Sequence, residues 1–402
     1  DIEQIVRGVM ADVQQRGWDA VVEYAERFDG KAPYIVEPKV LDDAYNACDP
    51  KLIAALEKAA ANIRDYHEQM LVKTWEWNRS KGETLGQTVR GLSRVGIYVP
   101  GGTAAYPSSV LMNAIPAKVA GVGELIMVTP PTENMSNEVL AAAKIAGVDT
   151  VIAIGGTQAI AALTYGAGFI PQVDKIVGPG NAFVAAAKKL AFGTVDMIAG
   201  PSEILVLADG TCNPAFVAAD MLSQAEHDKL ASAVLLTDSM AQAQAISCEM
   251  ERQAKQLPRW DIIKESVANY GCAIVFDDLK DACKMADVVA PEHLEVVTAA
   301  PRELLPYLHN AGAIFLGQYA PEPLGDYMAG PCHVLPTSGT ARFFSPLSTD
   351  TFLKKTSVIE YTRDALESYA QDIIALAQSE HLDAHANSIA VRFAEENNDE
   401  NR

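Results

Sequence analysis

Apolar and polar positions along the chain follow two patterns with different spacing. Up to about residue 70, apolar residues recur every three or four positions, as in "IEQIVRGVMADVQQRGWDAVVEYAERF" (2–28) and "PKLIAALEKAAANIRDYHEQML" (50–71). This spacing predicts long amphipathic helices, because positions three and four apart lie on one face of a helix. Gly17 interrupts the first pattern and predicts a break there.

Beyond Gly96, short apolar runs alternate with helical ones. The first series is "VGIYVP" (95–100), "ELIMVTP" (124–130), "DTVIAIGG" (149–156), "DKIVGPG" (174–180) and "EILVLAD" (203–209), and the second is "SAVLLTD" (232–238), "CAIVFDD" (272–278), "VVAPEHLEVV" (288–297) and "AGAIFLG" (311–317). Alternation of strands and helices favours crossover units and parallel sheets. We therefore predict an α/β protein with two parallel-sheet layers.

After about residue 345 the chain is polar and helical in pattern. This tail is too short to hold a hydrophobic core by itself. We expect it to pack on something else, such as a second subunit.

Length and composition narrow the classes of protein. A chain of 402 residues, 49% of them hydrophobic, is expected to form two or more domains. A net charge of -20 argues against binding to nucleic acid or to an anionic membrane, since both require a basic surface. The six cysteines form no CxxC pair, which argues against a disulfide framework and a cysteine zinc site. No run of 18 apolar residues occurs, and a reducing, cytoplasmic compartment fits best.

The stretch "SQAEHD" (223–228) places Gln224 and His227 three residues apart, on one side of a helix. The pair is half of a possible metal site. The same pattern is typical of a helix end with solvated polar groups, and alone it favours that second interpretation.

Two glycine turns have the form of a strand that ends where a helix begins. In "VDKIVGPGNAFVAAAKK" (173–189), Gly178 and Gly180 precede Asn181, and "VIAIGGTQAIAAL" (151–163) repeats the design with Gln158. Such turns can hold a phosphate at a helix N-terminus. Neither is the GxGxxG dinucleotide fingerprint, so the pattern leaves phosphate cradles and ordinary turns equally open.

Two further groups carry candidate chemistry. "APEHLEV" places Glu292 beside His293 after a strand, with Pro291 suited to the first turn of a helix. An adjacent acid and imidazole can divide general acid and base duties, although a lone pair of this kind is weak evidence. The loop "GDYMAGPCHVLPTSGTARFFSPL" (325–347) contains Asp326 and His333, and its glycines and prolines indicate a fixed loop, which favours function over a plain connection.

The remaining histidines divide into two groups. For His67 and His309 we expect structural roles, in a charged helix and at a helix end. His381 and His385 lie four apart on one expected helix face, a plausible ligand spacing.

Taken together, these blocks resemble the histidinol dehydrogenase family over nearly the whole chain. The similarity runs through "VGIYVPGGTAAYPSSVLMNAIPAKVAGV" (95–122), "VDKIVGPGNAFVAAAKKLAFG" (173–193), "DMIAGPSEILVLAD" (196–209), "SQAEHD", "PEHLEV", "GDYMAGPCHVLPTSGTARF" (325–343) and "LDAHANSIAVR" (382–392). Long, ordered blocks of this kind exclude chance similarity. The resemblance implies an NAD-dependent oxidation of L-histidinol through L-histidinal to L-histidine.

The family pattern assigns a role to each candidate residue. The implied zinc ligands, for one ion per subunit, are Gln224, His227, Asp326 and His385. The implied catalytic pair is His293, as the base for the alcohol, and Glu292, which activates water for the aldehyde step. The implied NAD contacts are Tyr98, Gln158 and Asn181. The implied substrate contacts are Ser202, His333 and Glu380, together with His293 and the four metal ligands.

The resemblance also implies a fold of two incomplete Rossmann-like domains, with terminal segments exchanged in an intertwined homodimer. We expect an N-terminal helical segment (1–30), a first, discontinuous domain (31–94 with 206–345), a second, NAD-binding domain (95–205) and a helical tail (346–402). The exchange would place His385 or Glu380 in a site shared between subunits. Part of the family's usual N-terminal segment is missing, which we expect to weaken the dimer and spare the chemistry.

Several alternatives remain beside the histidinol dehydrogenase interpretation. His381 could replace His385 as a ligand, although the local match favours His385. A paralogous dehydrogenase of another small polar alcohol, a zinc hydrolase and a non-catalytic metal-binding scaffold are the other functional candidates. We expect a cytoplasmic location, or a plastid if the source is a plant.

Overall fold

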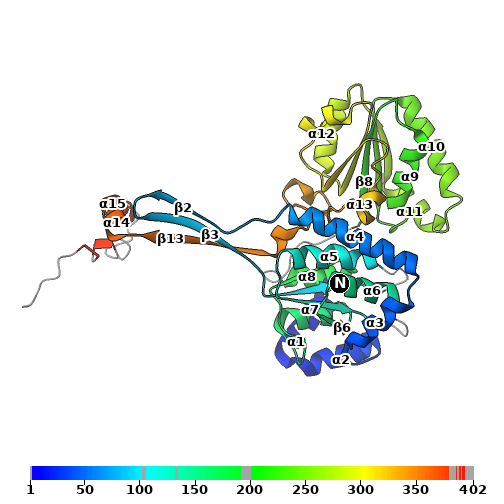
Figure 1. Cartoon of the computed structure of the whole chain (residues 1–402). Helices are drawn as coiled ribbons and strands as arrows, with labels where there is room; N and C mark the ends of the chain where they lie inside the picture. The colour runs from blue at the N-terminus through cyan, green and yellow to red at the C-terminus, as the bar shows by residue number, and fades with distance from the viewer. Residues whose placement is uncertain are drawn as a thin grey trace, which may run out of the picture. The chain divides into compact units, whose positions relative to one another are not determined.

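The computed structural model describes residues 2–101, 106–131, 135–191, 201–379, 386, 389–390 and 392–393 (Figure 1). Its contacts divide the chain into two compact units, which are described separately. The first comprises Asp1–Leu71 and Gly91–Phe352, and the second comprises Val72–Arg90 and Leu353–Arg402. None of the described helices is both long and apolar enough to cross a membrane.

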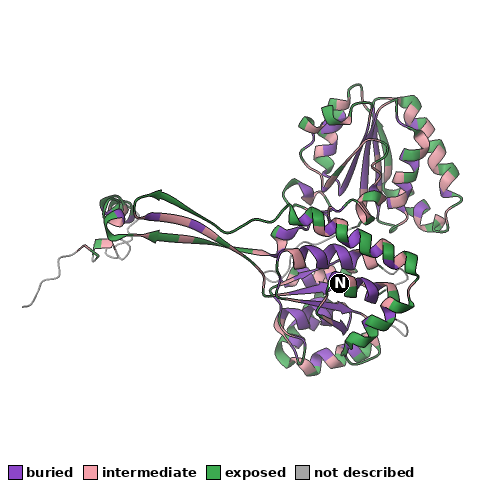
Figure 2. Ribbon diagram, in the orientation of Figure 1, coloured by how far each residue is buried: buried purple, intermediate pink, exposed green. Residues whose placement is uncertain are grey.

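The first unit contains two five-stranded sheets. In the first sheet the strand order is β1-β6-β5-β4-β7. Its strands are β1 (Tyr34–Val36), β4 (Arg94–Tyr98), β5 (Glu124–Thr129), β6 (Thr150–Ala153) and β7 (Lys175–Val177). β4 to β7 are parallel, and only β1 runs antiparallel, against β6. The parallel strands are almost wholly buried, as Figure 2 shows, and this agrees with their continuous apolar sequences.

Helices cover both faces of this sheet. One group is α1 (Ile2–Arg16), α2 (Trp18–Asp29), α7 (Gly156–Tyr165) and α8 (Ala182–Leu190), and the other is α3 (Pro38–Ala47), α4 (Pro50–Glu68), α5 (Pro107–Val119) and α6 (Asn137–Ala146). Each group packs among its own members. Because the chain reverses direction across the sheet after β6, right-handed crossovers place the two groups on opposite faces. The predicted break at Gly17 is confirmed, since α1 ends and α2 begins around this residue, which has a φ of 60°.

The second sheet is fully parallel, with the order β10-β9-β8-β11-β12. Its strands are β8 (Glu203–Ala208), β9 (Ser232–Thr237), β10 (Gly271–Val275), β11 (His293–Val297) and β12 (Ala313–Leu316). Its helices are α9 (Pro214–Ala225), α10 (Met240–Ala254), α11 (Trp260–Tyr270) and α12 (Leu279–Val289). Alternate residues of β8 point to opposite faces: Ile204 joins the core under α9 and α10, and Leu205 joins the core under α12.

The two parallel-sheet layers predicted from the sequence are therefore confirmed, but some details of the prediction are wrong. The run 203–209, which was expected in the first series, forms β8 in the middle of the second sheet. Glu292 and His293 do not follow a strand: they follow α12, and His293 begins β11 because its backbone pairs with β8. Pro291 accordingly begins no helix. The division into domains remains a prediction. In that division β1 belongs to the first domain (31–94) and β6 to the second (95–205), although the two strands pair.

The described part of the second unit contains a three-stranded sheet and two helices. The strands β2 (Trp75–Ser80), β3 (Glu83–Gly91) and β13 (Leu353–Tyr361) lie in the order β13-β3-β2. They are followed by α14 (Arg363–Glu367) and α15 (Ala370–Ser379). The expectation of a helical tail is confirmed by α14 and α15 but is wrong for β13, which pairs with a strand about 270 residues earlier in the chain. Every residue of β2 is exposed, as Figure 2 shows.

The remaining elements are short and lie near the end of the first unit. They are α13 (Glu322–Tyr327) and the 3-10 helices η1 (Pro301–Glu303), η2 (Leu305–Tyr307), η3 (Thr340–Arg342) and η4 (Thr349–Phe352).

Candidate active site

The predicted catalytic residues lie at the amino end of β11, beside the amino end of its parallel neighbour β8. His293 pairs with Ile204 in the ladder between the two strands. Glu292, the residue before β11, therefore lies beside Glu203, the first residue of β8. Glu203 N donates to Glu292 Oε2 at 2.9 Å, and Glu292 N donates to Glu203 Oε2 at 3.3 Å. A third bond, from Ser338 N to Glu203 Oε1 at 3.0 Å, attaches the long loop to the same residue.

His293 is held in one tautomer. Its Nδ1 lies 3.0 Å from Glu203 O, and because a carbonyl oxygen only accepts, Nδ1 carries the proton. Nε2 is therefore the nitrogen with a free lone pair, and this buried atom has no hydrogen-bond partner among the described residues. Burial lowers the pKa of His293 to about 4, so the ring is neutral near pH 7. A neutral imidazole with an unpaired Nε2 can accept a proton.

The pKa of Glu292 is shifted in the opposite direction. Its side chain is buried, and burial raises its pKa well above the ordinary value, with the charge of Glu203 adding to the effect. Its Oε2 lies 3.5 Å from His293 Nδ1. A carboxyl group whose pKa is moved toward neutrality beside a neutral imidazole is the arrangement that general acid and base catalysis requires.

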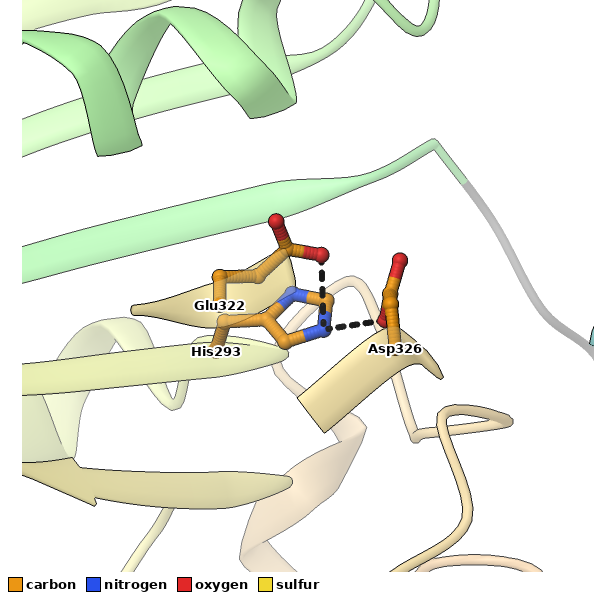
Figure 3. A group of neighbouring side chains, drawn as sticks. All are labelled: His293, Glu322 and Asp326. Atoms are coloured by element: carbon orange, nitrogen blue, oxygen red, sulfur yellow. Dashed lines mark ion pairs between the residues drawn. The ribbon is translucent and has the colours of Figure 1, made fainter. Parts of the chain in front are cut away.

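Two acids of α13 face His293 from the other side (Figure 3). Glu322 Oε1 and Asp326 Oδ1 each lie 3.9 Å from His293 Nε2. The two acids are four residues apart, so they share one face of the short helix. The three residues offer ligand atoms that all lie within 4.8 Å of one another, a spacing that could hold a metal ion. Burial, and then the charge of Asp326, raises the pKa of Glu322 to about 8.

Glu322 is held by groups behind it. Ser223 Oγ donates to its Oε2 at 3.1 Å, and its backbone N donates to Glu295 Oε1 at 2.8 Å. Glu322 itself is 1% exposed, and Oε1, the oxygen on the side of His293, has no hydrogen-bond partner in the described part of the chain. These contacts direct one unpaired carboxyl oxygen at the candidate metal position.

Gln224 and His227 come from the end of α9, next to Ser223. Gln224 is buried in the last turn, and its Oε1 is unpaired within the part of the chain that the structure describes. His227 follows the helix and is exposed, with Nδ1 2.9 Å from Ser223 O. That carbonyl fixes the proton on Nδ1 and leaves Nε2 free to bind a metal. The helical pattern that paired these residues is confirmed only for Gln224, because α9 ends at Ala225.

His333 extends the cluster. Its Nδ1 lies 3.7 Å from Asp326 Oδ1, and its Nε2 lies 3.5 Å from Ser109 Oγ on α5. Burial lowers the pKa of His333 to about 4. A cavity of about 350 Å³ is lined by His293, Asp326 and His333 at its polar end and by residues such as Phe315 and Leu335 elsewhere. Its size suits a small molecule.

Three predicted site residues are not part of this described cluster. Ser202 immediately precedes Glu203, and its carbonyl accepts a hydrogen bond from Ser232 N at 3.0 Å. Glu380 and His385 lie outside the described residues, as does His381. The structural roles expected for two other histidines are consistent with their contacts: His67 is buried with Nδ1 2.8 Å from Ile63 O, and His309 pairs with Asp287.

The predicted NAD contacts lie at the carboxyl edge of the first sheet. Tyr98 ends β4, and its hydroxyl accepts from Gly156 N at 3.1 Å. Gln158, in the first turn of α7, is buried and donates from Nε2 to Asp29 Oδ2 at 3.1 Å. Asn181 follows β7 and caps α8, its Oδ1 accepting from Phe183 N and Val184 N at 3.1 Å each.

Both glycine turns thus use the chain's own groups at their helix N-termini. Gly178 approaches β4 so closely that a Cβ would lie 2.1 Å from Tyr98 O, and its φ of +102° also favours glycine. β4 and β7 are neighbours on either side of the point where the chain reverses direction. Doubly wound sheets bind nucleotides at this switch point, and Tyr98 and Asn181 flank it.

Glu203 and Glu322 are the residues of this cluster that sequence reasoning missed. Glu203 follows the predicted contact Ser202 directly, and Glu322 precedes Asp326 by one helical turn. The spacing between the two acids of α13 was a usable signal. However, the segment "PEPLGDY" contains two prolines and a glycine, which predict a loop rather than a helix.

The donor set of the cluster suits a divalent metal ion. The buried, unpaired atoms Gln224 Oε1 and Glu322 Oε1 are oxygen donors, and Nε2 of His227 is a nitrogen donor. Asp326 adds a carboxylate, and no thiolate contributes among the described residues. Nitrogen and oxygen donors of this kind fit zinc and also other divalent metals.

Comparison with known proteins gives a consistent result. Residues 1–393 match the family model of histidinol dehydrogenase. A histidinol dehydrogenase of Heliobacterium mobile is 54% identical over 396 residues, covering 96% of this chain and 93% of its own. One of Bacillus subtilis (strain 168) is 51% identical over 394 residues, covering 96% and 92%. The crystal structure of histidinol dehydrogenase from Elizabethkingia anophelis superposes with a TM-score of 0.93 at 36% identity, covering 98% of this chain and 92% of that one.

Proposed function

The chain belongs to the histidinol dehydrogenase family, oxidoreductases that act at the end of histidine biosynthesis, and we propose that it converts L-histidinol through L-histidinal to L-histidine using NAD and one zinc ion per subunit. The observation that carries the chemistry is the pair at the start of β11. His293 is neutral with Nε2 unpaired, and the buried Glu292 next to it has a raised pKa.

His293 acts as the base in the first oxidation. Its Nε2 takes the proton of the substrate hydroxyl as hydride leaves the same carbon, giving the aldehyde. The fixed tautomer supports this role, because Nδ1 donates to Glu203 O and the basic lone pair is always on Nε2. Bound NAD supplies the hydride acceptor in both oxidations.

Glu292 acts in the second oxidation. An aldehyde has no hydroxyl to deprotonate, so water must first add to the carbonyl carbon. Glu292 takes a proton from this water as the water oxygen bonds to the carbonyl carbon, and the carbonyl oxygen becomes an alkoxide. This hydrate anion then loses hydride and becomes the carboxylic acid. Burial raises the pKa of Glu292, and a carboxylate with a raised pKa is a stronger base than an ordinary one.

We assign metal binding to four residues, of which Asp326 lies beside His293. Gln224, His227, Asp326 and His385 would hold the zinc ion, His385 lying outside the described residues. Zinc bound there would position the substrate by holding the substrate's imidazole and amino nitrogens. The unpaired Oε1 of Glu322 also faces this position, so we include Glu322 among the groups that stabilise the cation.

The remaining assignments are Ser202, His333 and Glu380 for the substrate and Tyr98, Gln158 and Asn181 for NAD. His333 lines the same cavity as His293, which supports its role. Tyr98 and Gln158 meet at the first turn of α7, which supports theirs. We also propose an intertwined homodimer in which the subunits exchange their tails. We further propose a cytoplasmic location, which the bacterial source of the relatives supports.

The proposal is tested by following NADH formation from L-histidinol with protein that has been stripped of metal and then reloaded with zinc. We expect activity to disappear with a chelator and return with zinc. Activity on another small alcohol but none on histidinol would point to a paralogous dehydrogenase. Metal binding without any NAD binding would point to a hydrolase.

A further inference from the structure

Asp29 stands among the proposed NAD contacts, although no sequence motif marks it. It is the last residue of α2, which packs on α7. Its Oδ2 accepts from Gly155 N at 2.9 Å and from Gln158 Nε2 at 3.1 Å. The next amide, Gly156 N, donates to the Tyr98 hydroxyl. Asp29 therefore contacts one proposed cofactor residue directly and lies beside the amide that holds another.

The chain makes room for this carboxylate. A Cβ on Gly155 would lie 3.0 Å from Asp29 Oδ1 and 2.6 Å from Cγ of Pro130, the residue that follows β5. Glycine thus allows Asp29 to approach the carboxyl ends of β5 and β6. This edge of a parallel sheet is where doubly wound folds bind their nucleotide.

A carboxylate at this position excludes phosphate from the start of α7. Two N–H groups of that turn already donate to Asp29 and Tyr98, so they cannot hold a pyrophosphate as in the common dinucleotide fingerprint. The negative charge of Asp29 also repels a phosphate. The hydroxyls of a ribose meet no such repulsion and can donate to a carboxylate, which has about four acceptor positions. Among the described residues, two hydrogen bonds use those of Asp29, and the residue is half-buried rather than enclosed.

We propose that Asp29 is a specificity-determining residue that accepts a hydrogen bond from the adenosine ribose of the cofactor and rejects a dinucleotide with a 2′-phosphate. The inference rests on the proposed function, since it assumes that a nicotinamide dinucleotide binds at Tyr98 and Gln158. It adds a discriminating group from α2, outside the glycine turns, to the contacts implied by the family resemblance.

The test is a fluorescence titration of the full-length protein with NADH and with NADPH, for wild type, Asp29→Asn and Glu26→Gln. Asn keeps one acceptor oxygen for Gly155 N but removes the charge. Glu26 is exposed on the same helix, so its change removes one negative charge without touching α7. We expect Asp29→Asn to lower the ratio of NADH to NADPH affinity at least about tenfold, because a charge-assisted hydrogen bond and a phosphate repulsion are lost together. Glu26→Gln should leave that ratio unchanged.

Three other results would overturn the inference or the proposed cofactor. If Asp29 only supports Gln158, Asp29→Asn would weaken both dinucleotides equally, as Gln158→Ala would, and an unchanged ratio would overturn the proposal. Wild-type protein that binds neither dinucleotide would overturn the proposed cofactor, and this inference with it. Tight NADH binding with an unchanged ratio in Asp29→Asn would overturn the inference alone. Thermal melting curves of the variants show whether a loss reflects misfolding.

Discussion

Glu203 and Glu292 exchange hydrogen bonds: each side chain accepts from the backbone N–H of the other, at 2.9 and 3.3 Å. This reciprocal pair joins the starts of two parallel strands, β8 and β11. It fixes the backbone from which His293 projects, and the carbonyl of Glu203 also selects the tautomer of that ring. One residue outside the proposed chemistry therefore orients both members of the catalytic pair.

Replacing Glu203 by Ala should reduce stability and activity together. The amide of Glu292 would lose its acceptor, and an unsatisfied buried donor costs about 1–3 kcal/mol. The amide of the exposed Ser338 would lose its bond to Glu203 and be hydrated instead. Glu203→Gln keeps one acceptor oxygen and should lose less. Melting temperature and kcat for histidinol and histidinal measure the effect. An Ala variant that matches wild type in both would show that the reciprocal pair has no positioning role.

Glu292→Gln and His293→Asn should separate the two oxidations. Without the carboxylate, hydration of histidinal slows, and we expect a loss of about 10²–10⁴-fold in kcat for histidinal. The loss for His293→Asn should be of the same order with histidinol, where a hydroxyl proton must be removed. Separate assays with the alcohol and the aldehyde make the comparison. Wild-type histidinal oxidation by Glu292→Gln would remove the water-activating role.

Glu322→Gln should weaken zinc binding. The change replaces a carboxyl group, whose Oε1 is unpaired and faces the proposed metal position, with an amide that cannot ionise when the cation binds. Groups around a metal site typically contribute about 10–100-fold in affinity. Metal content and competition with a chelator report this independently of turnover. Glu303→Gln, an exposed acid on η1, is the matched control. Equal zinc affinity in both variants would rule out this role for Glu322.

His67 should make the fold sensitive to mild acid. The side chain is fully buried on α4, and burial lowers its pKa below the ordinary value. The unfolded chain therefore binds the proton first. The contribution of His67 is fully present above a pH of about 6.5 and is lost as the pH falls toward the lower folded pKa, by at most about 1.4 kcal/mol per pH unit.

Urea unfolding at pH 7.5 and 5.5 measures this effect in wild type and in His67→Gln, which cannot titrate. The drop in unfolding free energy should be smaller in the variant. An equal drop in both proteins would show that His67 does not contribute.

The sequence predicted the architecture well where periodicity is strong. The strands of both sheets are continuous apolar runs between helices, and local spacing alone specifies such elements. It did not predict β13, because this strand alternates weakly and owes its existence to pairing with β3. Tertiary partners override propensity in strands of this kind.

The candidate site shows the same limit. Glu292, His293, Asp326 and His333 were singled out because their neighbouring residues are chemically distinctive, and the structure brings them together. Asp29 was not, because its contact with Gly155 joins two distant segments, and Glu322 was not, because the prolines and the glycine around it predict a loop. Spacing within a segment is readable from the sequence, whereas the meeting of α2 with α7, or of α9 with α13, is not.

The measurement that tests the central claim most directly is the amount of NADH formed when zinc-loaded protein consumes a limiting, known quantity of L-histidinol. The account predicts two NADH per histidinol, one for each oxidation, with histidine as the product. One NADH per histidinol, with histidinal accumulating, would contradict the claim that Glu292 and His293 complete both oxidations in one site.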